Sequence, residues 1–356
     1  MNRARLWSVP AMSILSIGLL AACGEEKPSF ALLPDGQTFR QDRTGINNKL
    51  DILFVINDQP NMSAFQEKLV TSMSTFMNIF VTKGFDYKIA VTTTSGYMAD
   101  PTLNGYSAVN EDLADFNDTN GIQSTGIHVI TPSVPDIFSV FAINAKPSKN
   151  SAGQDARSFS SMRQALRNTR PINAGFLRSD GFLAVIIVDN QEDFSGNARC
   201  NGCNINQRYN APTLDPVDVY IDFLNTATNS SGAAARYNVS AMTQIAVPCQ
   251  GGANMVRIMD LATRTNGVLG DICQADFGSS MADMADRIAS LSTQFYLDRV
   301  PDVSTITVDV NGVRIPQDAA NGWTYNADAN SIQFHGSAIP PQDASINVNF
   351  DPVTIK

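Results

Sequence analysis

Residues 50–56 read LDILFVI and residues 182–188 read FLAVIIV, and these two stretches decide the fold. Each is a nearly continuous apolar run of strand length, which is typical of a strand covered by helices on both faces. Apolar residues recur at helical spacing from Phe65 to Phe80, and a further strand-like run, YKIAV, occupies 87–91. This order of strand, helix and strand predicts a βαβ unit with a right-handed crossover. We therefore expect the two decisive runs to lie side by side at the centre of a mainly parallel sheet.

The same alternation continues along the chain. A further strand is predicted at 242–247, and helices are predicted at 158–168, 217–227, 254–265 and 279–292. Residues 100–150 are ambiguous, with a single short apolar run at 128–130. Alternating strands and helices predict an α/β domain over 49–298, a Rossmann-like, doubly wound and mainly parallel sheet covered on both sides.

The pattern changes after Pro301. Short alternating runs such as ITVDV at 306–310 are separated by turn residues, among them the hairpin signal Asn311-Gly312. These runs predict a small antiparallel β module over 299–356.

Composition and charge exclude some partners. The chain has 356 residues, which is enough for two ordinary domains, and 43% of them are hydrophobic, which is enough for a sizeable core. The formal net charge is −9. An acidic surface repels phosphate backbones, so we expect no nucleic-acid partner.

The amino terminus has the features of a secretory signal. Arg3 and Arg5 precede an apolar stretch from Ala11 to Leu20, which is too short to span a bilayer. The following residues, LAACG, place small side chains before Cys23 and resemble the lipobox of bacterial lipoproteins. This resemblance implies a signal peptide over 1–22, cleavage before Cys23, acylation (including palmitate) of that cysteine, and a flexible linker over 23–48. The alternative is an ordinary signal with a chance cysteine.

The predicted lipid anchor also indicates where in the cell the protein is located. Several acyl chains give stable attachment, since each buried CH₂ contributes about 0.8 kcal/mol. Gly24 is not the aspartate associated with inner-membrane retention. We therefore expect a lipid-anchored protein of the bacterial cell envelope, at the outer membrane, on its periplasmic or surface face.

Four further cysteines remain in this exported chain: Cys200, Cys203, Cys249 and Cys273. An even number favours disulfides, and three pairings exist. The simplest joins Cys200 to Cys203 and Cys249 to Cys273. A redox motif or half of a zinc site at the Cys-x-x-Cys is the alternative, but its loop-like surroundings favour a structural bridge.

Several segments resemble a von Willebrand factor type A domain. The run LDILFVI followed by Met62 resembles the first strand and loop of that family. Residues 175–178, 183–188 and 192–195 resemble the fourth strand and acidic loop of such domains in lipoproteins of predatory and gliding bacteria, and residues 267–273 are a third match. The C-terminal residues 310–312 and 322–323 resemble the β module that follows such domains. The resemblance implies a metal-ion-dependent adhesion site at the carboxyl end of the sheet, where open α/β sheets place ligands.

The chain departs from the family at the metal-binding positions. Where the family has Asp-x-Ser-x-Ser this chain has Asn57, Gln59 and Asn61, and the fourth-strand aspartate position is matched to Asn190. Amide oxygens can coordinate a hard cation but do not neutralise it. We therefore predict a degenerate site without metal, which binds a partner through amide and backbone hydrogen bonds. Alternation along the strand predicts that the neighbouring Asp58 and Asp189 point elsewhere.

The sequence shows no recognisable catalytic motif or cofactor site. Its two histidines, His128 and His335, lie in loop or strand-edge contexts, and there is no nucleophile elbow, zinc-protease motif or phosphate loop. Asp189, Glu192 and Asp193 could act as paired carboxylates, but a solvated charged loop is the favoured interpretation. We expect a non-enzymatic lipoprotein that binds a protein or an envelope polymer. The alternatives are an envelope hydrolase using residues 189–193 and a purely structural envelope protein.

Overall fold

The computed structural model describes residues 39–44, 48–99, 116–147, 156–167, 171–196, 214–230, 235–245, 249 and 255–353. The chain divides into two units, Met1–Gln37 and Thr38–Lys356, and every described element belongs to the second. The predicted signal peptide, the predicted lipid site Cys23, and Cys200 and Cys203 lie outside the described residues.

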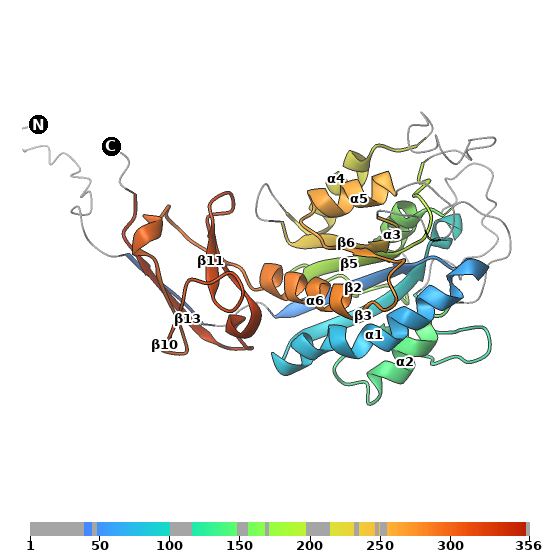
Figure 1. The fold of residues 1–356 in the computed structure, drawn as a ribbon, viewed down its shortest axis with the longest axis horizontal. Helices are drawn as coiled ribbons and strands as arrows, with labels where there is room; N and C mark the ends of the chain where they lie inside the picture. Colours follow the sequence, from blue (N-terminus) through green and yellow to red (C-terminus); the bar gives the residue numbers. More distant parts are fainter. Residues whose placement is uncertain are drawn as a thin grey trace, which may run out of the picture. The chain divides into compact units, whose positions relative to one another are not determined.

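A six-stranded sheet forms the centre of the α/β part, with the strand order β4-β3-β2-β5-β6-β7 (Figure 1). The strands are β2 (Lys49–Ile56), β3 (Asp86–Thr93), β4 (Val129–Ile130), β5 (Phe182–Val188), β6 (Tyr237–Thr243) and β7 (Leu269–Asp271). All neighbours are parallel except β4, which runs antiparallel to β3. The prediction that the two apolar runs are central neighbours is confirmed, because β2 pairs with β5 along its length.

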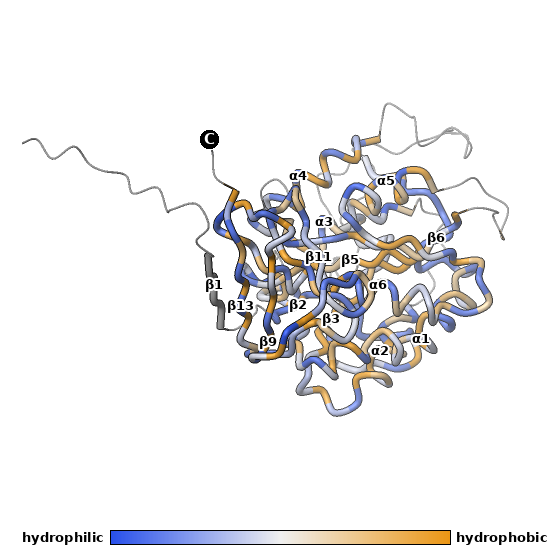
Figure 2. The backbone as a smooth tube through the Cα atoms, turned by 60° about the vertical axis from the view of Figure 1, so that its left-hand side comes forward, coloured by the Kyte–Doolittle hydropathy of each residue, from blue (hydrophilic) through white to orange (hydrophobic). Residues whose placement is uncertain are grey.

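Helices cover both faces of this sheet (Figure 1). One face carries α1 (Ser63–Thr82), α2 (Ile137–Asn144) and α6 (Gly278–Ser292), and the other carries α3 (Ser158–Leu166), α4 (Val217–Ala227) and α5 (Val256–Arg264). Within β2, Phe54 packs in the first core and Leu53 and Val55 pack in the second. Figure 2 shows the hydrophobic stretches that result along β5 and β6. Burial on both faces explains why these strands lack polar alternation.

A separate antiparallel module follows, made of two small sheets. Their orders are β1-β13-β9-β10 and β11-β12-β8. The strands are β1 (Phe39–Thr44), β8 (Phe295–Tyr296), β9 (Thr307–Val310), β10 (Val313–Ile315), β11 (Trp323–Asn326), β12 (Ser331–Phe334) and β13 (Ser345–Phe350), with short 3-10 turns at Val303–Thr305 (η5) and Gly336–Ala338 (η6).

Two segments differ from the sequence-based expectation. Phe39–Thr44 falls in the predicted linker but forms β1, which pairs with β13. Backbone pairing at a sheet edge needs no apolar run, so the sequence FRQDRT gives no strand signal. The strand expected at 242–247 is Tyr237–Thr243, because its buried residues include the polar Asn238 and Ser240.

One of the expected disulfides is present. Cys249 and Cys273 are bonded, with their Cα atoms 5.6 Å apart. The bond joins the segments that follow β6 and β7 and therefore lies at the carboxyl edge of the central sheet. No helix in the described part of the chain is long and apolar enough to cross a membrane.

Candidate functional site

The candidate site lies where β2 and β5 end. Ile56 pairs with Val188, so the next residues, Asn57 and Asp189, face each other across the two strands. The connection from β2 leads to β3 on one side, whereas β5 lies on the other side. In open α/β sheets the carboxyl ends of strands at such a reversal form the usual ligand-binding crevice.

Asn57 is the centre of a hydrogen-bonded cluster. Its side chain is fully buried, and its Nδ2 donates to Asp189 Oδ1 at 2.7 Å. Its Oδ1 accepts from the Gln59 backbone N–H at 2.8 Å, and its backbone oxygen accepts from Gln66 Nε2 at 3.0 Å. The side chain thus holds the loop after β2 against the loop after β5.

Asp189 is a site residue that sequence reasoning placed wrongly. It was expected to point away, but its Oδ1 accepts from Asn57 and from the Gln191 backbone N–H at 2.9 Å, and its Oδ2 accepts from Ser158 Oγ at 2.9 Å. Complete burial raises the pKa of this carboxyl to about 7, against the opposing effect of its hydrogen bonds. The register explains the error, because Asn57 is opposite residue 189 and not residue 190.

A pair of glutamines extends the cluster toward solvent. Gln59 Nε2 donates to Gln191 Oε1 at 3.1 Å, and Gln191 Nε2 donates to Gln59 Oε1 at 2.6 Å. Both side chains are half-buried. We call Asn57, Gln59, Asp189, Gln191 and Ser158 the amide network.

The other two predicted site residues lie outside this network. Asn61 is exposed in the 3-10 turn Pro60–Met62 (η1), just before α1. Asn190 is buried, and its backbone oxygen accepts from Gln244 Nε2 at 2.7 Å. Within the described residues its Oδ1 has no hydrogen-bond partner. The structure therefore brings together Asn57 and Gln59 but neither Asn61 nor the Asn190 side chain.

Asp58 does point away from the network, as alternation predicts. Its Oδ1 accepts from Ser95 Oγ at 2.9 Å and from Thr94 Oγ1 at 3.4 Å. Burial raises the pKa of this carboxyl too. Asp58 therefore connects the end of β2 to the residues after β3.

The expectation of a solvated acidic loop after β5 is wrong. Glu192 and Asp193 are 8% and 0% exposed. Asp193 forms an ion pair with Arg257 Nη2 at 3.2 Å and accepts from the Phe159 backbone N–H at 3.0 Å. Glu192 accepts from the Arg257 backbone N–H at 3.0 Å, and burial raises its pKa to about 7. Buried carboxylates need such partners, and these ones tie α3 and α5 to the loop.

The oxygen atoms of the amide network do not form a suitable set of ligands for a hard divalent cation. Such ions take several oxygen ligands, usually with carboxylates among them. Here one carboxylate, Asp189, already accepts from Asn57, Ser158 and a backbone N–H. The Asn57 amide donates to Asp189 Oδ1, so a cation could bind that oxygen only by displacing this hydrogen bond. No group of three or more His, Cys, Asp or Glu side chains in the described residues is placed to hold a metal ion.

The two histidines take part in local contacts instead. His128 Nδ1 lies 2.5 Å from the Phe116 backbone oxygen, and His335 Nε2 lies 2.7 Å from Thr324 Oγ1. Burial lowers the pKa of His335. Neither contact includes a carboxylate of the loop after β5.

Comparison with known proteins gives the following result. No protein-family model matches the chain, and no curated protein sequence matches it. Among solved structures, the chain is similar to the pilus adhesin SpaC of Lactobacillus rhamnosus GG in its open conformation, with 12% identity and a TM-score of 0.44, over 88% of this chain and 40% of that one. It is also similar to the proximal thread matrix protein 1 of the mussel byssus, with 11% identity and a TM-score of 0.37, over 73% of this chain and 51% of that one.

A third similar structure is the pilus adhesin RrgA of Streptococcus pneumoniae, with 7% identity and a TM-score of 0.33, over 88% of this chain and 58% of that one. The chain thus spans about 40% to 58% of the length of these proteins. Similarity of this degree carries no argument about function, which therefore has to be argued from the site.

Proposed function

We propose that this chain is an extracytoplasmic lipoprotein, anchored through Cys23, whose von Willebrand A-like domain binds a protein or an envelope polymer at the carboxyl edge of the central sheet. In this proposal the site works without a metal ion and without catalysis. The observation that carries it is the amide network, which lies at the reversal point of the sheet where such folds bind ligands.

The polarity of the network supports a neutral, hydrogen-bonding partner. Gln59 and Gln191 are half-buried and offer both donors and acceptors at the outer end of the cluster. Asn57 and Asp189, which lie beneath them, are hydrogen-bonded to each other, to the backbone of the two loops and to Ser158, and they hold the loops in place. Peptide and sugar polymers carry the amide and hydroxyl groups that can exchange hydrogen bonds with such a pair.

The buried acidic loop supports binding over hydrolysis. A glycosidase-type mechanism needs two carboxyl groups that reach the substrate. Asp193 is engaged by Arg257, and Glu192 is engaged by backbone N–H groups. Both carboxylates therefore act as buried groups that stabilise the loop after β5.

The binding proposal is tested by sedimentation of the full chain with two purified fractions, protein-free peptidoglycan sacculi and outer-membrane vesicles. The double variant Gln59→Ala/Gln191→Ala is expected to bind about tenfold more weakly than the wild type, because two amide contacts are lost. The variant Gln317→Ala, which changes an exposed glutamine of the β module, is the control. The acyl anchor attaches both variants to vesicle lipid alike, so only binding that weakens in the double variant is counted. Such binding to sacculi identifies a polymer, and such binding to vesicles, when protease treatment of the vesicles removes it, identifies a protein. Equal binding of the double variant and the wild type to both fractions contradicts the proposal.

The anchor is tested separately by labelling cells with palmitate. Cys23→Ala is expected to abolish incorporation of the label and to leave residues 1–22 attached, as mass spectrometry would detect. Cys273→Ala is the control and should retain the label. Full labelling of the Cys23→Ala chain would exclude this cysteine as the lipid site.

A further inference from the structure

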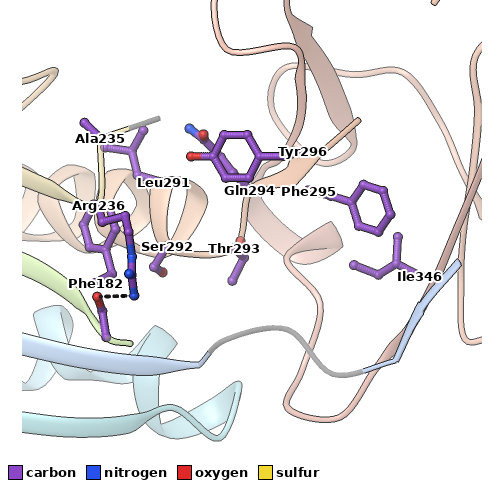
Figure 3. Close-up of a pocket in the computed structure, with 11 residues that line it drawn as sticks. Phe182, Ala235, Arg236, Leu291, Ser292, Thr293, Gln294, Phe295, Tyr296 and Ile346 are labelled. Atoms are coloured by element: carbon purple, nitrogen blue, oxygen red, sulfur yellow. Dashed lines mark hydrogen bonds between the residues drawn. The ribbon is translucent and has the colours of Figure 1, made fainter. Parts of the chain in front are cut away.

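A second candidate site lies at the opposite edge of the central sheet. A cavity of about 260 Å³ is lined by residues at the amino ends of β5 and β6, by the end of α6 and by β8 and β13 (Figure 3). Its walls include Phe182, Leu291, Phe295, Tyr296 and Ile346. Ligand cavities in proteins measure about 300–1,000 Å³, so this one suits a small ligand, and polar residues (Ser292, Thr293 and Gln294) line it beside the apolar ones.

Arg236 supplies the positive charge in this cavity. Its Nη2 donates to the Gly181 backbone oxygen at 3.3 Å. No carboxylate of the described residues forms an ion pair with Arg236. Other arginines of the described residues, such as Arg178 and Arg257, do form ion pairs with carboxylates. A guanidinium carries five N–H donors in a planar fork, so most of its hydrogen-bonding capacity stays open.

The side chains around Arg236 are arranged for a ligand with an apolar body. In Figure 3 the Tyr296 hydroxyl points toward the side where Leu291 and Arg236 lie. Phe295 and Ile346 lie on the opposite side of the Tyr296 ring in this view. Burial raises the pKa of the Tyr296 phenol, and the positive charge of Arg236 opposes this rise.

We propose that this cavity binds a small carboxylate with an aromatic or branched apolar body, held by the Arg236 guanidinium. A carboxylate matches the planar fork of a guanidinium. Arg236 is the only positively charged side chain among the residues that line the cavity, which favours a monoanion over a phosphate dianion. The amide network lies at the carboxyl end of β5, whereas this cavity lies at its amino end, so the two sites are separate.

Two sources of such a carboxylate are distinguishable. A free acid would fill the cavity alone, and the terminal carboxylate of a polypeptide ending in an apolar residue would place only its last residue there. The test therefore uses N-acetylphenylalanine as the free acid and a short peptide ending in phenylalanine. The amide form of each compound is the uncharged control.

Binding is measured by calorimetry and by protein NMR shifts on the full chain. The acids are expected to bind at least about tenfold more tightly than the amides, the difference typical of one charge-assisted contact. Arg236→Gln should remove this preference, and Arg314→Gln, which changes an exposed arginine of the β module, should keep it. Tighter binding of the peptide than of N-acetylphenylalanine identifies a polypeptide terminus as the ligand, and the reverse identifies a free acid.

A second variant keeps the test decisive if Arg236→Gln folds poorly. Leu291→Phe enlarges a half-buried side chain on the cavity wall and should weaken acid and amide alike by filling the space. Equal affinity for acid and amide in the wild type overturns the proposal. So does an undiminished preference for the acid in a folded Arg236→Gln protein.

Discussion

The acidic side chains that follow strand β5 and the half-buried Arg236 near its amino end differ in how many partners they have. At the carboxyl end, Asp189 and Asp193 have hydrogen-bond or ion-pair partners for both of their oxygens. At the amino end, Arg236 lines a cavity with one backbone acceptor and no carboxylate partner among the described residues. A saturated group stabilises the fold, and an unsaturated one leaves binding capacity for a ligand. The difference predicts large effects on stability for the acidic side chains after β5 and a small one for Arg236.

The largest effect is expected for the buried ion pair. Asp193→Asn leaves Arg257 buried without its counter-charge, which should lower the free energy of unfolding by about 3–5 kcal/mol. Asp309→Asn disrupts an exposed ion pair with Arg314 and should cost less than about 1 kcal/mol. Urea unfolding of both variants measures the contrast. Similar small losses would mean that the loop after β5 is not held by this pair.

The disulfide at the same edge should have the next largest effect. Cys249 and Cys273 are 24 residues apart, and cross-links of that span stabilise by about 3 kcal/mol through the unfolded chain. Cys249→Ser is expected to lower the free energy of unfolding, measured by urea unfolding, by that amount, and reductant should do the same to the wild type. If reductant leaves the wild type unchanged, the bond contributes nothing to stability.

A smaller change is expected when Asn57 becomes acidic. Asn57→Asp removes the N–H donor to Asp189 and sets two carboxylates against each other, at a cost of about 1–3 kcal/mol at neutral pH. The same change creates a pair of carboxylates that Mg²⁺ or Ca²⁺ can bridge, so either ion should raise the melting temperature of the variant. The wild type is the control and should not respond. A wild-type response of the same size would contradict the conclusion that the amide network does not fit a divalent cation.

The last prediction concerns the dependence of stability on pH. Burial raises the pKa of Asp189 from 3.8 to about 7, so between these values the folded chain binds more protons than the unfolded chain. Stability therefore decreases as pH rises through this window and levels off above it. Asp189→Asn is expected to flatten that slope, since its amide can still accept from Asn57 and can donate to Ser158. Denaturant unfolding at pH 4 to 7 measures the difference, and parallel profiles would rule out Asp189 as its source.

The sequence predicts the centre of the fold but not the pairs that complete the site. Continuous apolar runs identify β2 and β5 as central strands because only a doubly covered sheet buries every residue. The same continuity hides their register, so Asn190 was matched to the position that Asp189 occupies. Asp193 and Arg257 are 64 residues apart in the sequence, and no local sequence pattern indicates such a contact. The cavity at Arg236 depends on how β8 and β13 approach the sheet, which local propensities do not encode.

The pairing of β1 with β13 has a mechanical consequence. β1 is the first described strand after the predicted anchor, and six residue pairs hold it antiparallel to β13, from Phe39 opposite Phe350 to Thr44 opposite Ser345. Tension applied from the amino-terminal side along β1 acts across the ladder, whose hydrogen bonds are perpendicular to the strands, so the bonds share the load in shear. A chain tethered at that end would pass a pulling force into the β module before the force reaches β2 and the amide network.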